Sequence, residues 1–561
     1  MKKYLWVFLS LLLLACNPGK DQDPDSGGDL IVIPLWPPEN VYLHSATKTS
    51  LTFQWNTVMG ATSYGWLLMD KKYETLKEGV VTQRHVEVTG LKPGTSYLFS
   101  VRCQAKDEIF EYSSPIEATT LEKEADPAVD ALCVDAPLVL EFESAPVLGT
   151  SGLIKVFKSE SAEEVDRINL ADIATVNVRD DGVMLPKEQI TSATERNSFM
   201  DVLSSGGRTR TVHYTPLQVK GNTLVVKLHS GVLDFDTEYY LTMDESVCGK
   251  AVGAGEYKFT TASSPSTSAI RVAADGSGDF CTLQRALTHA GPGATITLAN
   301  GTYPELLYLR EKKNITVKGD SRSGVRIAYP NSEICMNGSS ARCMWLVENC
   351  DNLVLENLTI ENTYGAQGQA ETIYFNSGSN AHKLIIENCS LHSLQDTFLC
   401  KGEVYVHNSL IAGNVDFIWG YPKACLFEDC EIRCEKYSSG FIIQARVPSA
   451  SMKGFVFLNC NITGGEGAKD GSIYLARSAG QADCFDNVVF VNCTMGSVIN
   501  PAGWYTNPAP NPTTPTAASG WREYGSKTPS GAAVTGHNTY GLVLSAAEAE
   551  AYSTKAAVLG W

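Results

Sequence analysis

The chain has 561 residues, 43% of them hydrophobic and 19% charged. This composition is typical of a folded protein, and the length predicts about two to four domains. The 45 basic and 62 acidic residues leave a formal net charge of −17, which argues against a nucleic-acid partner because phosphate binding requires a basic surface. An anionic polysaccharide is not excluded, since local basic residues can still line a groove.

The first segment, residues 1–15, is predicted to be a signal peptide. A basic start precedes an apolar run, Tyr4–Leu14, that is too short to span a bilayer as a helix. The run ends in Leu-Leu-Ala-Cys, which resembles a bacterial lipoprotein cleavage box and implies lipidation of Cys16. The alternative is an ordinary secretion signal with a chance cysteine. We expect an exported lipoprotein at the outer membrane or cell surface, held by its lipid anchor alone, with residues 16–36 as a polar tether.

Two strand-rich segments follow the tether. Residues 37–121 alternate apolar and polar residues in short runs broken by turns, a pattern that predicts a β-sandwich. Trp55, Tyr64 and the phrase Leu-Lys-Pro-Gly-Thr-Ser-Tyr ending at Tyr97 resemble a fibronectin type III module, which specifies a fold and not an activity. Residues 126–262 resemble a bacterial Ig-like β-sandwich. We interpret both modules as spacers that hold the last domain away from the membrane.

A short phrase recurs along residues 270–561. An apolar pair, followed by Glu in three of the five copies, precedes Asn or Asp and then Cys, with copies ending at Cys350, Cys389, Cys430, Cys460 and Cys493. The interval from Asn388 to Asn408 is 20 residues, and from Asn408 to Asp429 it is 21. Strands this short bury their apolar side only when coils stack. The sequence therefore predicts an all-β chain that ends in a parallel β-helix, with Asn ladders at the turns and mostly buried free thiols.

Three segments break this repeat with residues that a solenoid does not need. They contain Asp396 in Leu-Gln-Asp-Thr, Asp416 in Asn-Val-Asp-Phe-Ile-Trp-Gly, and Arg477 in Leu-Ala-Arg-Ser. The two aspartates are 416 − 396 = 20 residues apart, so they are expected on neighbouring coils at roughly one strand spacing of 4.7–4.9 Å. Of two such carboxyls, one keeps its proton near neutral pH while the other stays charged. This is the arrangement of an acid beside a nucleophile.

Gln-Asp-Thr, Val-Asp-Phe-Ile-Trp-Gly and the later Leu-x-Arg are similar to signature segments of pectin methylesterases. The match extends over nearly all of residues 270–561, from Ala-Asp-Gly-Ser-Gly-Asp-Phe ending at Phe280 to Gly-Trp at Trp504. The resemblance implies a right-handed parallel β-helix. It also implies hydrolysis of the methyl esters of galacturonate residues in pectin, with release of methanol and no cofactor.

The resemblance also implies a role for each matching residue. Asp416 would attack the ester carbonyl carbon, and Asp396 would serve as acid and then as base. Arg477 would bind Asp416 and keep it ionised. Gln395 and Gln369 would donate amide N–H groups to the developing oxyanion, although a solvent-facing loop position is the competing interpretation of Gln369.

Two tryptophans, Trp419 and Trp504, are predicted to stack on sugar rings, with core packing as the alternative for Trp504. One departure from the family pattern concerns the residues after Arg477. The family continues with Pro-Trp, whereas this chain has Ser-Ala-Gly. We therefore expect the chemistry to be retained while the contact with the sugar differs.

Two other functions remain as alternatives. A calcium-dependent enzyme similar to pectate lyases would need several further acidic ligands, and the segments around Asp396 and Asp416 are poor in them. A non-catalytic surface protein that binds polysaccharide predicts no convergence of Asp, Arg and Gln on one face. No His or Cys cluster has the spacing of a metal site. We expect a metal-free monomer whose partner is pectin or a related galacturonate polysaccharide.

Overall fold

The computed structural model describes residues 37–38, 41–56, 58, 61–105, 108–120, 131–191, 194–534 and 536–561. The signal peptide, the lipidation site Cys16 and the tether predicted for residues 16–36 lie outside the described residues. Within the described part of the chain, no helix combines the length and the apolar character needed to cross a membrane.

The first module is a sandwich of two antiparallel sheets with its own hydrophobic core. The Trp55 and Tyr64 rings pack edge to face in this core with centroids 5.5 Å apart. The Tyr97 hydroxyl accepts a hydrogen bond of 2.9 Å from the Lys92 backbone N–H, which fixes the turn before its strand. The strands are β1 (Tyr42–Ala46), β2 (Ser50–Gln54), β3 (Ser63–Met69), β4 (Thr75–Val81), β5 (His85–Thr89), β6 (Ser96–Ala105), β7 (Glu108–Tyr112) and β8 (Ile116–Thr119).

The second module contains a four-stranded and a three-stranded antiparallel sheet together with two hairpins. Its likeness to Ig-like domains stays a prediction. The strands are β9 (Leu138–Glu141), β10 (Leu153–Lys158), β11 (Glu164–Asn169), β12 (Val176–Val178), β13 (Met184–Pro186), β14 (Met200–Ser205), β15 (Arg208–His213), β16 (Leu217–Lys220), β17 (Thr223–Val226), β18 (Glu238–Met243) and β19 (Val252–Thr260).

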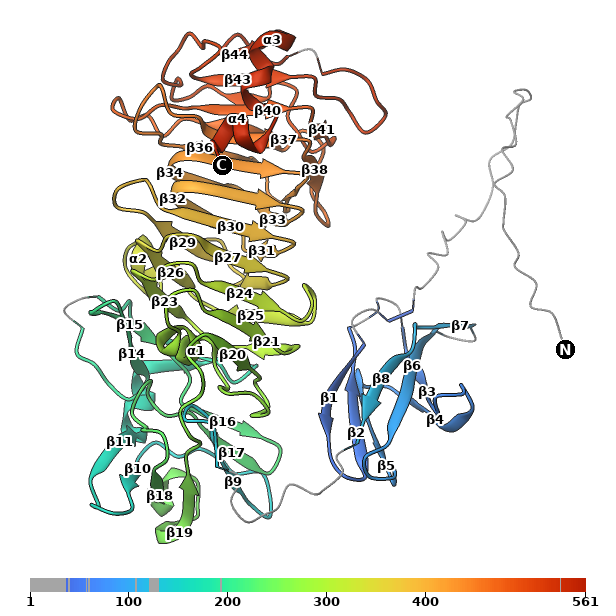
Figure 1. Ribbon diagram of the computed structural model, residues 1–561, viewed down its shortest axis with the longest axis vertical. Coiled ribbons are helices and arrows are strands. Elements are labelled where there is room, and N and C mark those ends of the chain that lie inside the picture. Colours follow the sequence, from blue (N-terminus) through green and yellow to red (C-terminus); the bar gives the residue numbers. More distant parts are fainter. Residues whose placement is uncertain are drawn as a thin grey trace, which may run out of the picture.

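The remaining chain forms the predicted parallel β-helix, whose strands stack one above another from β20 to β44 (Figure 1). One 17-stranded sheet contains two rows of strands that share β32 (Phe398–His407) and β34 (Val415–Glu428). The first row is β20 (Ala269–Val272), β21 (Thr295–Leu298), β24 (Thr316–Gly319), β27 (Leu353–Glu356), β30 (Lys383–Glu387), β37 (Gly454–Leu458), β40 (Val488–Val491), β43 (Trp521–Tyr524) and β44 (Gly541–Val543). The second row is β23 (Leu307–Arg310), β26 (Trp345–Glu348), β29 (Ile373–Asn376), β36 (Gly440–Ala445), β39 (Ile473–Arg477) and β42 (Trp504–Tyr505).

A separate eight-stranded parallel sheet forms the third face of the β-helix. It contains β22 (Gly301–Tyr303), β25 (Val325–Tyr329), β28 (Thr359–Asn362), β31 (Ser390–His392), β33 (Leu410–Gly413), β35 (Glu431–Cys434), β38 (Asn461–Gly464) and β41 (Thr494–Met495). Short helices cover parts of the coil. They are α1 (Leu283–His289), α2 (Ser339–Arg342), α3 (Ala546–Ala549) and α4 (Lys555–Leu559), of which the last two pack on the outside of the first row.

The repeated Asn-Cys phrase has a conformational cause. Its Asn or Asp residue adopts a left-handed backbone, with φ of 50° at Asn388, 46° at Asn408 and 52° at Asp429, and these residue types tolerate that region best after Gly. The Asn388 side chain donates to the Oδ1 atom of Asn357 at 2.8 Å, one coil earlier. The cysteines of the five phrases are buried free thiols. The predicted ladders are therefore confirmed.

The second module is packed against the β-helix and is not a separate folding unit, while its role as a spacer stays a prediction. Its core is continuous with that of the β-helix, and the Phe235 ring packs edge to face against Phe280 with centroids 6.2 Å apart. The Asp135 carboxylate accepts hydrogen bonds from the Cys281 and Thr282 backbone N–H groups at 3.0 and 2.8 Å. Alternating strand patterns show that a sandwich has an inner face, but they do not show what covers its edges. The module and the β-helix form one packed unit.

His213 of the second module provides a pH test of this junction. Burial lowers the pKa of His213 from 6.5 to about 4, although a hydrogen bond with the Asn331 side chain opposes the shift. The folded chain therefore keeps a neutral ring where the unfolded chain takes up a proton. We expect this residue's contribution to the free energy of unfolding to be complete above pH 6.5 and to fall by about 3 kcal/mol towards pH 4. Denaturant unfolding of His213→Gln across this range should show a smaller acid-induced loss than the native chain.

Candidate active site

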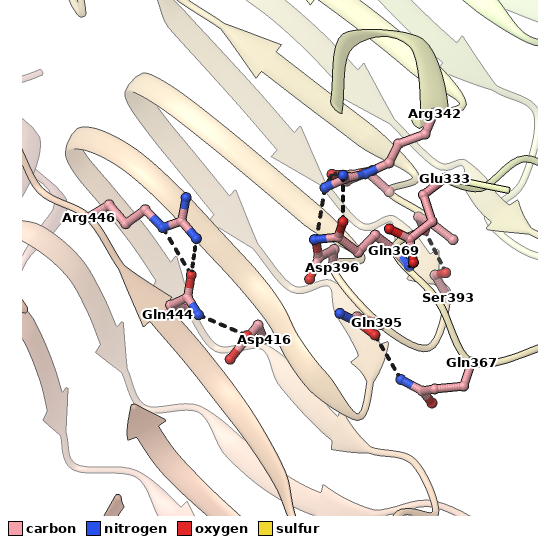
Figure 2. A network of polar contacts seen from close by, with 12 residues as sticks. Glu333, Arg342, Gln367, Gln369, Ser393, Gln395, Asp396, Asp416, Gln444 and Arg446 are labelled. Carbon is pink, nitrogen blue, oxygen red and sulfur yellow. Dashed lines mark hydrogen bonds and ion pairs between the residues drawn. The ribbon is translucent and has the colours of Figure 1, made fainter. Parts of the chain in front are cut away.

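Asp396 and Asp416 lie on neighbouring coils, Asp396 at the turn that leads into β32 and Asp416 as the second residue of β34. Gln395 forms a parallel bridge with Val415, and Gln369 forms the same bridge with Gln395. The Asp396 backbone N–H donates to the Val415 carbonyl oxygen at 3.1 Å. Both aspartates have the left-handed backbone of this turn, with φ of 64° and 46°. The predicted placement of the two aspartates on neighbouring coils is thus confirmed, and Gln369 belongs to the same face (Figure 2).

The Asp416 carboxylate is held by an arginine and an amide, and it is 4% exposed. The Arg477 Nε atom donates to its two oxygens at 2.8 and 3.0 Å, and Nη2 also bonds Oδ2. Gln444 of β36 donates to Oδ2 at 2.9 Å. These charge-assisted bonds pair the Asp416 carboxyl group with a cation and fix its orientation. Gln444 was missed by the sequence analysis, although a lone glutamine inside the apolar strand Phe-Ile-Ile-Gln-Ala is a usable signal.

The Asp396 carboxyl has different surroundings and is 3% exposed. Gln369 Nε2 and Arg342 Nη2 both donate to its Oδ2 atom, at 2.9 and 3.1 Å. Burial raises the pKa of Asp396 well above its ordinary value, and the negative charge of Glu371 raises it further, while Arg342 opposes the shift. Asp396 therefore keeps its proton at pH values where an exposed aspartic acid has lost it.

The amide groups predicted to bind the oxyanion are fixed by neighbouring side chains. Gln395 Oε1 accepts a hydrogen bond of 3.1 Å from Gln367, and Figure 2 shows the Gln395 amide nitrogen on the side of the two carboxylates. Gln369 Oε1 accepts a hydrogen bond of 2.7 Å from Arg342, and this bond fixes the Gln369 amide. Gln367 lies in a loop and Arg342 ends the short helix α2, and no repeat or motif marked either residue.

The structure contradicts the prediction that Trp504 stacks on a sugar ring. Trp504 is 1% exposed, stacks on Trp521 with centroids 5.2 Å apart and donates its indole N–H to Glu523 at 3.2 Å. The alternative for Trp504, packing in the core, is therefore confirmed, because the coil interior takes up the whole ring. Trp419 is 7% exposed. The Arg446 guanidinium lies 4.8 Å from a Trp419 ring centroid and leaves little of the indole accessible.

Three half-buried rings lie beside Arg477, where the family's usual aromatic is missing. The Phe441 ring centroid is 4.9 Å from the Arg477 guanidinium carbon. Tyr474 and Tyr505 pack against Phe441 with centroid distances of 5.9 and 5.0 Å. Ser478, the residue after Arg477, bonds the Asp486 carboxylate at 2.8 Å. An apolar surface therefore borders the site without the expected Pro-Trp.

One group of potential metal ligands occurs in the described part of the chain. Cys133, Asp135 and Cys281 have ligand atoms within 4.8 Å of one another. The group lies at the junction of the second module with the β-helix, and the Asp135 carboxylate already accepts the hydrogen bonds described above. It contains neither residue of the carboxylate pair.

Two regions of the chain match models of known protein families. Residues 269–560 match the family model described as Pectinesterase, and residues 36–119 match the fibronectin type III domain model. "Pectinesterase 31" of Arabidopsis thaliana is 32% identical over 43% of this chain and 77% of its own length. "Probable pectinesterase A" of Aspergillus niger is 27% identical over 48% of this chain and 84% of its own length. The solved structure of a pectin methylesterase from carrot is 24% identical, covers 52% of this chain and 92% of its own, and has a TM-score of 0.46.

Proposed function

Because the chain belongs to the pectinesterase family, we propose that its Asp396–Asp416 pair hydrolyses the methyl esters of galacturonate residues in pectin and releases methanol. The observation that carries this proposal is the asymmetry of the pair. Asp416 is bound by the Arg477 guanidinium and the Gln444 amide, whereas burial and Glu371 favour the protonated form of Asp396. An acid and a nucleophile are thus side by side in one site.

The first half of the proposed reaction forms a covalent intermediate. An oxygen of the Asp416 carboxylate attacks the ester carbonyl carbon, and the π electrons move onto the carbonyl oxygen. Amide N–H groups of Gln395 and Gln369 stabilise this oxyanion, a contribution typically worth about 10²–10³-fold per donor. Collapse of the oxyanion breaks the bond to the methoxy oxygen, which takes the proton of Asp396 and leaves as methanol.

The second half restores the enzyme. Asp396, now a carboxylate, takes a proton from a water molecule whose oxygen attacks the acyl carbon. The acyl–oxygen bond to Asp416 breaks, and galacturonate leaves as the free acid. Arg477 stabilises the Asp416 carboxylate that re-forms. Each proton donated in the first half is thus recovered in the second.

The raised pKa of Asp396 predicts the alkaline side of the pH profile. The acid must be protonated in the free enzyme, so kcat/KM should fall as the pH rises through the Asp396 pKa. In Asp396→Asn this alkaline limb should disappear and kcat should be about 10²-fold or more lower. A pH–rate profile of methanol release from methylated pectin checks both expectations. An unchanged alkaline limb in the variant would assign the acid to another group.

Methanol and proton release from methyl-esterified polygalacturonate test the proposed function. The full chain should release both in equal amounts while the length of the polysaccharide stays unchanged, because only the ester bond breaks. Shortening of the chain without methanol would contradict the proposal.

We further propose export and lipid anchoring, which the amino-terminal sequence alone supports. The apolar run before Cys16 and the cleavage-box pattern are the basis. Pectin is a large extracellular polymer, so a surface location suits the proposed substrate. Labelled fatty acid should be incorporated by the native chain and not by Cys16→Ser. Equal labelling of both would contradict the anchor.

A further inference from the structure

Arg342 links three side chains of the site, of which Gln369 and Asp396 are labelled beside it in Figure 2. Its Nη2 atom donates to Asp396 at 3.1 Å and to Glu371 at 2.8 Å, and its Nη1 atom donates to Gln369 at 2.7 Å. Its Nε atom completes a two-pronged contact with the Glu371 carboxylate at 3.0 and 3.1 Å. Glu371 is 0% exposed. A buried ion pair thus contacts both the acid and an amide of the oxyanion site.

The second module holds the backbone on both sides of Arg342. Arg210 of β15 is 6% exposed and bonds the carbonyl oxygens of Ala341, at 2.9 Å, and of Cys343. It also bonds the Leu307 carbonyl oxygen at 2.6 Å. Since Ala341 and Cys343 flank Arg342 directly, a guanidinium from the second module fixes the end of α2 from which Arg342 projects.

Further contacts tie the same segment to the second module. The Ile190 backbone N–H donates to the Cys335 carbonyl oxygen at 2.9 Å, and the Ile190 carbonyl oxygen accepts a hydrogen bond from the Asn337 N–H at 3.2 Å. His213 of β15 bonds the Asn331 side chain, whose amide in turn donates to the Ala341 carbonyl oxygen at 3.0 Å. The segment that carries Arg342 is therefore clamped along its length.

We propose that Arg342 is a positioning residue for the acid, and that the second module, through Arg210, keeps it in contact with Asp396. The inference rests on the proposed ester hydrolysis and deepens it. Arg342 and Glu371 together add no net charge beside Asp396, so the acid can hold its proton. When Asp396 has donated that proton, the Arg342 contact stabilises the carboxylate that must act as the base.

The charges of this cluster predict the direction of each effect. Glu371→Gln removes a negative charge and leaves Arg342 beside Asp396, which favours the ionised acid. The alkaline limb of kcat/KM should then move to lower pH by about one to three units. Adding Arg342→Met in the same background removes the positive charge without leaving Glu371 unpaired. The limb should therefore return towards higher pH.

The Glu371→Gln background also isolates the contribution of Arg210. Adding Arg210→Met releases the backbone beside Arg342, so the Arg342 guanidinium should move away from Asp396. The alkaline limb of kcat/KM should then shift part of the way towards that of the Glu371→Gln, Arg342→Met double variant. The matched control is Arg522→Met in the same background. Arg522 is a buried arginine that bonds Gly520, Ala517 and Tyr552 and contacts neither carboxylate of the site. Its loss should lower stability and leave the limb in place.

The experiment measures kcat/KM for methanol release from methylated pectin against pH, with the full chain and these variants, after far-ultraviolet circular dichroism has checked folding. Opposite movements of the limb in Glu371→Gln and in its Arg342→Met derivative support the proposal. Coincident limbs in these two overturn it, and this comparison stands whether or not the Arg210 variant folds. A native chain that releases no methanol would instead overturn the proposed function itself.

Discussion

Asp416→Asn is expected to abolish methanol release from methylated pectin, with kcat lower by about four orders of magnitude or more. The neutral amide has almost the same size as the carboxylate, so the coil and the Gln444 contact are kept. It lacks the anionic oxygen that attacks the ester carbon. Removal of a covalent nucleophile lowers kcat by this order of magnitude in other hydrolases. Steady-state rates of methanol release at saturating substrate test the expectation.

The matched control for this variant is Asp429→Asn. Asp429 also adopts the left-handed backbone, with φ of 52°, but it lies in a ladder turn and its nearest ion-pair partner is His407 at 3.6 Å. Its replacement by asparagine should leave kcat within about twofold of the native value. If Asp416→Asn retained a tenth or more of the native kcat, Asp416 would not be the nucleophile.

Removal of the second module is expected to unfold the β-helix. A chain that begins at residue 265 would lose the apolar side chains that share its core and the Arg210 contacts with four backbone carbonyl groups. Each large apolar side chain that becomes exposed costs about 1.5–3 kcal/mol, so a few of them exceed the stability of an ordinary domain. Solubility and thermal unfolding of residues 265–561 check this expectation.

Residues 131–561 provide the control for this truncation. This chain lacks the first module, whose core is a separate cluster, and it should unfold cooperatively and release methanol at the native rate. A soluble 265–561 chain with the same midpoint of unfolding and the same pH profile would contradict both the shared core and the proposed action of Arg210.

The coil geometry of the β-helix could be predicted from the sequence because it repeats. Asn388 and Asn408 are 20 residues apart, and a left-handed turn residue recurs once per coil. The same interval predicts that Asp396 lies beside Asp416. Periodic features are visible in the sequence because each coil needs the same type of turn residue and the same pattern of buried apolar residues.

Contacts between distant segments that lie outside the repeat and the motifs could not be predicted. Arg342 lies in a non-repeating segment, and its contact with Asp396 spans 54 residues. Arg210 reaches the Met344 carbonyl oxygen across 134 residues. Trp504 shows a different limit of the sequence. It lies in a motif and was expected to contact the sugar, whereas its ring is buried in the coil interior against Trp521. The residue type alone does not determine whether an aromatic ring faces the core or the groove.

The most direct test of the central claim is the product that the native full chain forms from methylated pectin in the presence of a calcium chelator. If Asp396 and Asp416 form an ester hydrolase, methanol and new carboxyl groups should appear at undiminished rate, without unsaturated products that absorb ultraviolet light. Loss of activity in the chelator, together with ultraviolet-absorbing unsaturated products when calcium is restored, would contradict the account.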